Sequence, residues 1–277
     1  MTLTPKEKCM GFLFGRKKNT TVMPDMEGLH YEVANLQGLG RREYQEDAFC
    51  VANVFDEKKQ KEQGLLFAVC DGMGGLSNGQ DVSNLAAEII RKRFMELDRK
   101  SDISEGLRRI LTECSDEIYK KHHEESGSTG IMGVILDGSL YFASVGDSLL
   151  YLLRQGVSVR LNELHNHGNA ILKKCVEEDN WNPFLARNDV QKNALTSFLG
   201  TESVILMDST QKPIELMPGD VLLACSDGVG SCFDEDELKD ILIATDAVES
   251  TRKIEQKVLQ ENNPNQDNYT AIVICVR

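Results

Sequence analysis

Short apolar runs, bounded by polar residues and glycines, recur along the chain from about residue 29 to the C-terminus. Runs of this length are typical of β-strands, which need only a few residues to cross a sheet. Two longer stretches repeat apolar residues every three or four positions, which is the period of an amphipathic helix. The predicted strands span residues 31–36, 48–54, 65–70, 131–136, 140–145, 149–153, 221–225 and 270–276.

The two helical stretches follow one another between the third and fourth predicted strands. Each has one apolar stripe, so each should pack one face against a sheet. Two more helices are predicted near the C-terminus: a short one entered at Asp234, with Glu237 as its capping-box partner, and one over about residues 248–259. The apolar stripes of the first two are Val82, Leu85, Ala86, Ile89, Ile90, Phe94 and Leu97, and Leu107, Ile110, Leu111, Cys114 and Ile118.

The connections between strands predict how the strands pair. Asp137-Gly138 and Gln155-Gly156 suit tight hairpins, and Pro218-Gly219 suits a type II turn. Strands joined by hairpins pair antiparallel, and paired helices pack outside the sheets. We therefore expect an α+β fold with two antiparallel sheets and helices on their outer faces, rather than a parallel βαβ sheet.

Two segments fall outside this pattern. Residues 163–193 are polar and predict a helical or irregular insertion, in which His165 and His167 belong to an exposed loop rather than to a soft-metal site. Residues 1–26 carry basic residues around an apolar patch too short for a signal-peptide core, so they predict a flexible N-terminal extension. Residues 27–277 are expected to form one domain.

Composition narrows the class of protein. The 277 residues are 41% hydrophobic and 27% charged, as in ordinary globular proteins of the aqueous phase. The formal net charge of −13 argues against nucleic-acid and membrane-surface partners, which normally require a basic patch. The eight cysteines form no Cys-x-x-Cys motif, and no apolar run approaches the roughly 20 residues of a membrane span. We expect a cytoplasmic protein with reduced cysteines.

Aspartates recur where the apolar strands end. Asp71, Asp147 and Asp227 come just after a predicted strand, and Asp47 and Asp267 come just before one. An aspartate at the rim of a buried strand costs free energy unless it is paired, and several that converge would repel one another. Lys and Arg are absent from these five stretches, so ion pairs are a poor explanation.

Hard divalent cations such as Mg²⁺ or Mn²⁺ would remove this repulsion, because they prefer carboxylate, carbonyl and water oxygens. Neighbouring glycines would allow a sharp turn and let a backbone carbonyl approach the ion. A single Asp-Gly pair at a strand end is more often a plain turn. The repeated pattern indicates a metal site only if the strand ends converge in the fold.

Taken in order, these residues resemble the metal-dependent Ser/Thr protein phosphatases of the type 2C family, in their bacterial form. The resemblance covers about residues 31–276; each motif is weak alone, and the ordered set is specific. The motifs are Arg42-Glu43-Tyr44-Gln45-Glu46-Asp47, Asp71-Gly72-Met73-Gly74-Gly75, Gly127-Ser128-Thr129, Gly146-Asp147-Ser148, Ser226-Asp227-Gly228 and Asp267-Asn268.

The resemblance implies a central antiparallel β-sandwich flanked by pairs of helices, with residues 163–193 as the flap of the family. It also implies a centre of two Mg²⁺ or Mn²⁺ ions at one end of the sandwich. Asp71 would bridge both ions, and Asp147 matches the position of a third ion in bacterial members. The other implied metal ligands are Asp227 and Asp267 at one ion, and Glu46, Asp47 and the Gly72 carbonyl at the other.

The implied mechanism is attack on phosphorus by a water shared between two divalent ions. Arg42 would neutralise the phosphoryl oxygens, because a guanidinium matches phosphate geometry; Arg41 is the alternative. Many eukaryotic members have histidine where this chain has Met73, which cannot donate a proton to the leaving group. Leu149 and Leu164 also depart from the family pattern, and these changes concern substrate docking more than hydrolysis.

The expected partners are phosphorylated proteins, the targets of Ser/Thr kinases, and the expected state is a monomer. The main alternative is a catalytically silent relative that keeps the fold to bind phosphoproteins. It is less favoured because Asp47, Asp71, Asp227 and Asp267 are all present. A dinucleotide-binding loop at residues 72–77 is rejected, because its sixth position is Ser77 rather than glycine.

Overall fold

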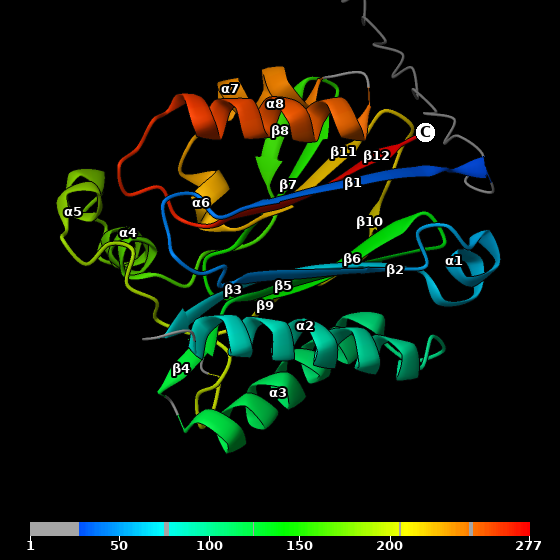
Figure 1. The fold of residues 1–277 in the computed structure, drawn as a ribbon, viewed down its shortest axis with the longest axis horizontal. Helices are drawn as coiled ribbons and strands as arrows, with labels where there is room; N and C mark the ends of the chain where they lie inside the picture. The colour runs from blue at the N-terminus through cyan, green and yellow to red at the C-terminus, as the bar shows by residue number, and fades with distance from the viewer. Residues whose placement is uncertain (1–27, 75–77, 124, 205, 244–245) are drawn as a thin grey trace, which may run out of the picture.

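Two β-sheets lie face to face at the centre of the molecule (Figure 1). The computed structural model describes residues 28–74, 78–123, 125–204, 206–243 and 246–277, so the predicted extension at residues 1–26 lies outside it. All strand pairs between these residues are antiparallel, as expected. One sheet has the order β1 (Tyr31–Gly38), β12 (Tyr269–Val276), β11 (Val221–Cys225), β7 (Leu149–Arg154) and β8 (Val157–Arg160). The other has β10 (Ile214–Glu215), β6 (Ser139–Val145), β5 (Gly130–Leu136), β3 (Leu65–Gly74) and β2 (Asp47–Ala52), with β4 (Ser126–Ser128) on β3 and β9 (Asp208–Ser209) on β6.

Helices cover the outer face of each sheet (Figure 1). The long helices α2 (Asn78–Glu96) and α3 (Ile103–His122) pack on the sheet that contains β3. The helices α7 (Glu235–Leu242) and α8 (Ala247–Gln260) pack on the sheet that contains β11 and β12. The layers therefore run helix, sheet, sheet, helix, which confirms the predicted fold class. Shorter helices are α1 (Glu57–Gln63) and α6 (Asp227–Gly230).

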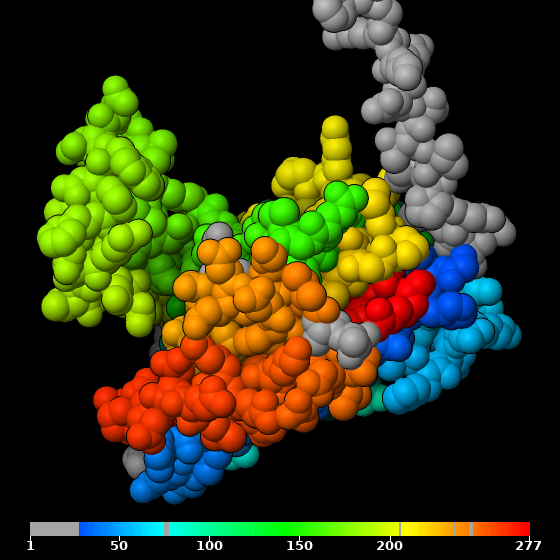
Figure 2. All heavy atoms as spheres, turned by 90° about the horizontal axis from the view of Figure 1, so that it is seen from above, coloured from blue at the N-terminus to red at the C-terminus, as the bar shows by residue number. Residues whose placement is uncertain are grey.

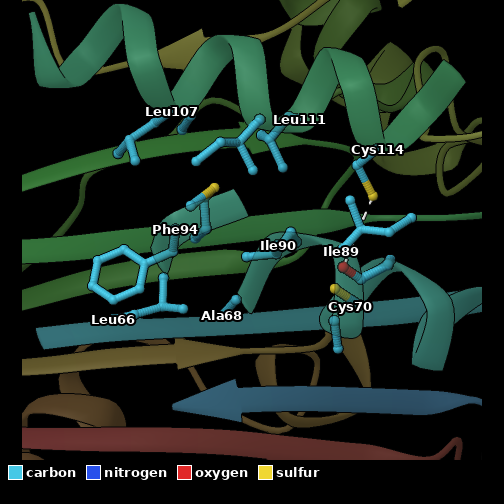
Figure 3. Close-up of a cluster of buried hydrophobic side chains, with 14 of the residues drawn as sticks. Leu66, Ala68, Cys70, Ile89, Ile90, Phe94, Leu107, Leu111 and Cys114 are labelled. Atoms are coloured by element: carbon cyan, nitrogen blue, oxygen red, sulfur yellow. Dashed lines mark hydrogen bonds between the residues drawn. The ribbon is translucent and has the colours of Figure 1, made fainter. Parts of the chain in front are cut away.

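Strand β3 shows how the sequence builds these layers. Leu66, Ala68 and Cys70 face α2 and α3, where they pack with Phe94 and Leu111 (Figure 3). The alternate residues of the strand, Leu65, Phe67 and Val69, pack between the two sheets. Because successive side chains of a strand point to opposite faces, a strand buried on both faces is apolar throughout. This is why residues 65–70 form an unbroken apolar run.

The local predictions agree with the structure. Asp137 and Gly138 have φ of 49° and 71°, as a tight hairpin between β5 and β6 requires, and Gly219 has φ of 90°. Asp234 and Glu237 form the predicted capping box of α7. The sequence did not indicate α1, which buries no residue. It indicated β8 only through the hairpin turn at Gln155-Gly156, because this short edge strand has mostly exposed residues.

Residues 163–193 form a lobe that stands out from the body of the molecule (yellow-green in Figure 2). The lobe contains α4 (His167–Glu177) and α5 (Pro183–Asn188), so the helical version of the prediction is confirmed. The expected exposed loop is wrong at His165, whose side chain is 3% exposed. Its Nδ1 accepts a hydrogen bond from the Gly146 amide at 3.1 Å, which satisfies the buried ring.

Membrane-spanning helices are absent from the described residues, none of whose helices combines the necessary length with sufficient apolar character.

Candidate metal centre

The predicted site residues meet at one end of the sandwich, around a cavity of about 400 Å³. Asp71 comes from β3, Asp147 from the turn between β6 and β7, and Asp227 from the junction of β11 and α6. Both sheets therefore contribute carboxylates. The described residues that line the cavity are Arg42, Glu46, Asp71, Gly72, Met73, Gly74, Thr129, Asp147, Asn193, Ala194, Leu195, Asp227, Asp267 and Asn268.

Asp47 is the one predicted site residue that is not among these lining residues. In the pairing of β2 with β3 it lies directly opposite Asp71, and it is 3% exposed. Its carboxylate accepts a hydrogen bond of 2.8 Å from the Ser226 hydroxyl, which in turn accepts one of 3.0 Å from the Thr270 amide. Ser226 thus connects β2 of one sheet to β12 of the other, next to Asp227.

The backbone of Asp71 is held by Thr129. The Asp71 amide donates to the Thr129 hydroxyl at 2.9 Å, and the Thr129 amide donates to the Asp71 carbonyl at 2.8 Å. The same hydroxyl lies 2.7 Å from that of Ser148, beside Asp147. Thr129 therefore fixes the relative positions of two predicted metal-binding stretches.

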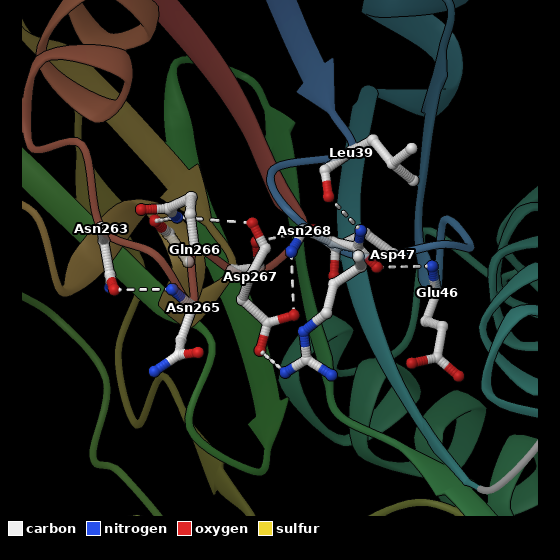
Figure 4. A network of polar contacts seen from close by, with 11 residues as sticks. Leu39, Glu46, Asp47, Asn263, Asn265, Gln266, Asp267 and Asn268 are labelled. Atoms are coloured by element: carbon white, nitrogen blue, oxygen red, sulfur yellow. Dashed lines mark hydrogen bonds and ion pairs between the residues drawn. The ribbon is translucent and has the colours of Figure 1, made fainter.

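Asn268 performs the same task for Glu46 (Figure 4). Its side chain accepts a hydrogen bond of 2.7 Å from the Glu46 amide and donates one of 2.9 Å to the Leu39 carbonyl. The Glu46 carbonyl accepts a hydrogen bond of 3.0 Å from the Gly72 amide. Glu46, Gly72 and Asp267-Asn268 thus form one connected network across the cavity.

Close backbone contacts explain two of the glycines. A Cβ atom at Gly72 would collide with the carbonyl oxygen of Gly79, and a Cβ atom at Gly228 would collide with that of Asn268. Neither position has room for a larger residue. The glycines that follow Asp71 and Asp227 therefore let these aspartates approach neighbouring segments closely.

Burial and mutual repulsion raise the pKa values of the cavity carboxylates. Burial raises the pKa of Asp71 well above its ordinary value, and the charges of Asp47 and Asp227 raise it further. Burial, with a smaller effect of Asp227, raises the pKa of Asp147 to about 7. Burial also raises the pKa of Asp47 to about 6, against hydrogen bonds from Ser226 and Thr270 that lower it. The pKa values of Asp227 and Glu46 are raised too, first by burial.

Arg42 forms one ion pair at the site, which the sequence did not indicate. Its Nη2 lies 2.6 Å from Oδ2 of Asp267, with both side chains partly exposed at the mouth of the cavity. The sequence argument missed the pair because Arg42 is distant from Asp267 along the chain. Arg41, the alternative phosphate ligand, instead contacts Asn262 at 3.4 Å.

The donor set suits hard divalent cations. Converging buried carboxylates with raised pKa values require positive charge, and Arg42, which pairs with Asp267 at the cavity mouth, is the one Lys or Arg among the described lining residues. Within the described residues, no group of three or more His, Cys, Asp or Glu side chains meets the geometric requirements of a metal site. The carboxylates therefore line the same cavity, but their side chains are not gathered closely enough to form a metal site in this conformation.

Sequence reasoning missed the contribution of the flap. Asn166 donates to Oδ2 of Asp147 at 3.5 Å, and Asn193 lines the cavity. Neither residue has a charge or a motif that indicates a role. Thr129 and Asn268 were recognised in motifs, but their hydrogen bonds to Asp71 and Glu46 depend on the fold and could not be read from spacing.

Comparison with known proteins decides the family. A family model described as "Protein phosphatase 2C" matches residues 31–170. The chain belongs to the protein phosphatase 2C family. It is therefore a protein phosphatase, as are the relatives and solved structures that it resembles.

One such relative is the "Serine/threonine phosphatase stp" of Listeria monocytogenes, 28% identical over 231 residues that cover 78% of this chain and 86% of the relative. The structure of the Ser-Thr phosphatase MsPP from Mycobacterium smegmatis, in complex with cacodylate, is 25% identical with a TM-score of 0.70 and covers 88% of this phosphatase and 97% of that chain. The catalytic domain of the phosphatase PstP, in complex with 2 manganese ions, has a TM-score of 0.70 over 90% of this chain and 99% of that one, and its 23% identity shows a shared fold.

Proposed function

We propose that this phosphatase hydrolyses phosphoserine and phosphothreonine side chains of other proteins at a two-metal centre. The observation that carries the proposal is the convergence of Glu46, Asp71, Asp147, Asp227 and Asp267 around one cavity, with Arg42 at its mouth. The names of the relatives support the Ser/Thr substrate class, and the manganese complex of PstP supports the metal type. The proposed substrates are products of Ser/Thr kinases, and the phosphatase is proposed to act as a cytoplasmic monomer.

We propose the metal ligands that the family resemblance implies, and the convergence of these carboxylates on one cavity supports them. Asp71 is proposed to bind two ions of Mg²⁺ or Mn²⁺, with a third at Asp147. Asp227 and Asp267 complete one position, and Glu46, Asp47 and the Gly72 carbonyl complete the other. Bound divalent ions would acidify a water at neutral pH and offset the charge of the phosphoryl group. Asp47 is buried behind a hydrogen bond to Ser226, so its contribution would pass through water.

The chain's own residues orient the substrate. Arg42 is half-exposed at the cavity mouth, and its planar fork can exchange the Asp267 carboxylate for two phosphoryl oxygens. Met73 lines the cavity and cannot donate a proton. None of the described lining residues is a histidine, cysteine or tyrosine, and bound divalent ions would keep the cavity carboxylates ionised, so we propose that water protonates the leaving alkoxide.

The test is hydrolysis of a phosphothreonine peptide by the purified chain with Mn²⁺ and with EDTA. Activity should require the metal, and Asp71→Asn and Asp227→Asn should each lower kcat/KM by about 100-fold or more, because a neutral amide is a weak ligand for a hard cation. Asp240→Asn, an exposed change on α7, is the matched control and should retain activity. A folded wild-type protein that hydrolyses no phosphopeptide with any divalent ion would instead support the silent binding module.

A further inference from the structure

A second cavity, of about 380 Å³, lies in the flap. It is bounded by α4, by α5, by the segment that returns from α5 toward the metal centre and, at Arg160, by the end of β8. The lobe that contains it stands clear of the body of the molecule in Figure 2. Its lining includes three cationic side chains, Arg160, Arg187 and Lys192, together with Trp181.

The three cations are exposed and have no carboxylate partner among the described residues. Arg160 donates from Nε to the Asn162 carbonyl at 3.1 Å, and Lys192 donates to the Arg187 carbonyl at 3.4 Å. Backbone carbonyls orient these side chains but do not neutralise them. Positive charge is therefore available to a ligand in this cavity, although the chain as a whole carries −13.

The flap cavity adjoins the metal centre. Asn193 lines both cavities, and Asn166 lines the flap cavity while it donates a hydrogen bond to Asp147. A polypeptide whose phosphorylated residue lies in the metal centre can therefore extend into the flap. A side chain close to the phosphorylated residue can then enter the second cavity.

Trp181 adds an apolar surface beside these charges. Its side chain is 65% exposed, which is unusual for tryptophan. Exposed tryptophan next to arginine is typical of protein-binding surfaces, where the ring packs on the aliphatic part of a partner side chain. The combination suits a glutamate or aspartate, with its short apolar stem and anionic end.

We propose that the flap cavity binds an acidic side chain of the phosphoprotein substrate, on one side of the phosphorylated residue. This inference rests on the proposed function. Exposed ion pairs are individually weak and are screened by salt, so the cavity should set a preference among substrates rather than determine whether they are hydrolysed. Two or three such pairs correspond to a preference of about three- to tenfold.

The test compares phosphothreonine peptides that carry a pair of glutamates, of glutamines or of lysines, with the pair moved stepwise along either side of the phosphothreonine. The wild type should show a kcat/KM about three- to tenfold higher for the glutamate peptide at one placement, and salt should reduce the difference. Arg187→Gln/Lys192→Gln should abolish this preference. Arg187→Glu/Lys192→Glu should reverse it in favour of a lysine pair.

The control is Lys120→Gln/Lys121→Gln, which removes the same charge from exposed positions of α3 and should keep the preference. All variants should hydrolyse p-nitrophenyl phosphate with Mn²⁺ at the wild-type rate, because this substrate has no acidic side chain to place in the flap cavity. Equal kcat/KM at every placement, or a preference that survives in Arg187→Gln/Lys192→Gln, would overturn the inference. Failure of the wild type to hydrolyse either substrate would overturn the proposed function itself.

Discussion

Ser226 illustrates how single hydroxyl groups support the metal centre. Its hydroxyl donates to the buried Asp47 carboxylate and accepts from the Thr270 amide. Ser226→Ala removes one of the hydroxyl donors to the buried Asp47 carboxylate and the acceptor of the Thr270 amide, so we expect the free energy of unfolding to fall by about 1–3 kcal/mol. Urea unfolding in EDTA measures this loss, and the affinity for Mn²⁺ should fall with it.

Ser203→Ala is the control for this change, because Ser203 is exposed and its side chain should contribute less than about 0.5 kcal/mol. If both variants unfold at the same urea concentration, the bridging role of Ser226 is wrong.

His165 predicts a pH dependence of stability. Burial lowers its pKa below the ordinary 6.5, helped by Lys173 and opposed by Glu163 and Asp208. Only the neutral ring can accept at Nδ1 from the Gly146 amide. Between the lowered pKa and 6.5 the unfolded chain binds more protons, so this contribution is complete above pH 6.5 and is lost as the pH falls.

His165→Asn tests that dependence, because the asparagine oxygen can accept the same hydrogen bond and does not titrate. The free energy of unfolding of the wild type, minus that of His165→Asn, should decrease from pH 7.5 to pH 5.5 in urea titrations. Taking the difference cancels the titration of the cavity carboxylates. Parallel pH profiles for the two proteins would contradict the prediction.

At the scale of elements, α3 derives its stability from the apolar stripe recognised in the sequence. Leu111 of α3 is fully buried, and its side chain packs in the cluster that α3 forms with α2 and the sheet (Figure 3). Leu111→Ala should lower the free energy of unfolding by about 2–5 kcal/mol, through lost burial and the cavity it leaves. Chemical denaturation measures the loss, and Leu259→Ala on α8, where the leucine is 61% exposed, should cost much less. Similar losses in both variants would contradict this packing.

Elements with strong periodicity could be predicted from the sequence, and weakly patterned ones could not. The stripe of α3 and the unbroken apolar run of β3 each reflect burial of a particular face, so the pattern is in the residues themselves. Helix α1 and strand β8 bury little, so their sequences carry no such signal. His165 was assigned to an exposed loop for a different reason: it is buried, but the Gly146 amide from which its ring accepts a hydrogen bond cannot be recognised in the sequence.

At the scale of the molecule, the sequence indicated which carboxylates lie at the ends of strands. It did not indicate that these strand ends lie close together in the fold. That meeting depends on the stacking of two sheets, which brings Asp71 and Asp227 to one cavity. The ion pair of Arg42 with Asp267 and the approach of Asn193 from the flap also arise only in the folded chain. The order of the motifs along the chain could be compared with a family, whereas the contacts between the motifs are seen only in the folded structure.

The carboxylate cluster predicts that metal stabilises the whole fold, and increasingly so at higher pH. Without metal, Asp47 and Asp147 have pKa values of about 6 and about 7 in the folded state, above the ordinary 3.8. Between these values the folded chain binds more protons than the unfolded one, so rising pH removes stability from the metal-free protein. Divalent ions bind the ionised carboxylates and reverse that loss.

The Tm in Mn²⁺ minus the Tm in EDTA should therefore grow from pH 5.5 to pH 7.5, as measured by thermal unfolding at both pH values. His165 contributes equally with and without metal, so it cancels in this difference. Asp71→Asn should shrink the increase, because it removes the carboxylate whose pKa is raised most clearly by its neighbours. A Tm that is independent of Mn²⁺ at both pH values would mean that the converging carboxylates do not bind the ion, since ligand binding to the folded state must raise its stability.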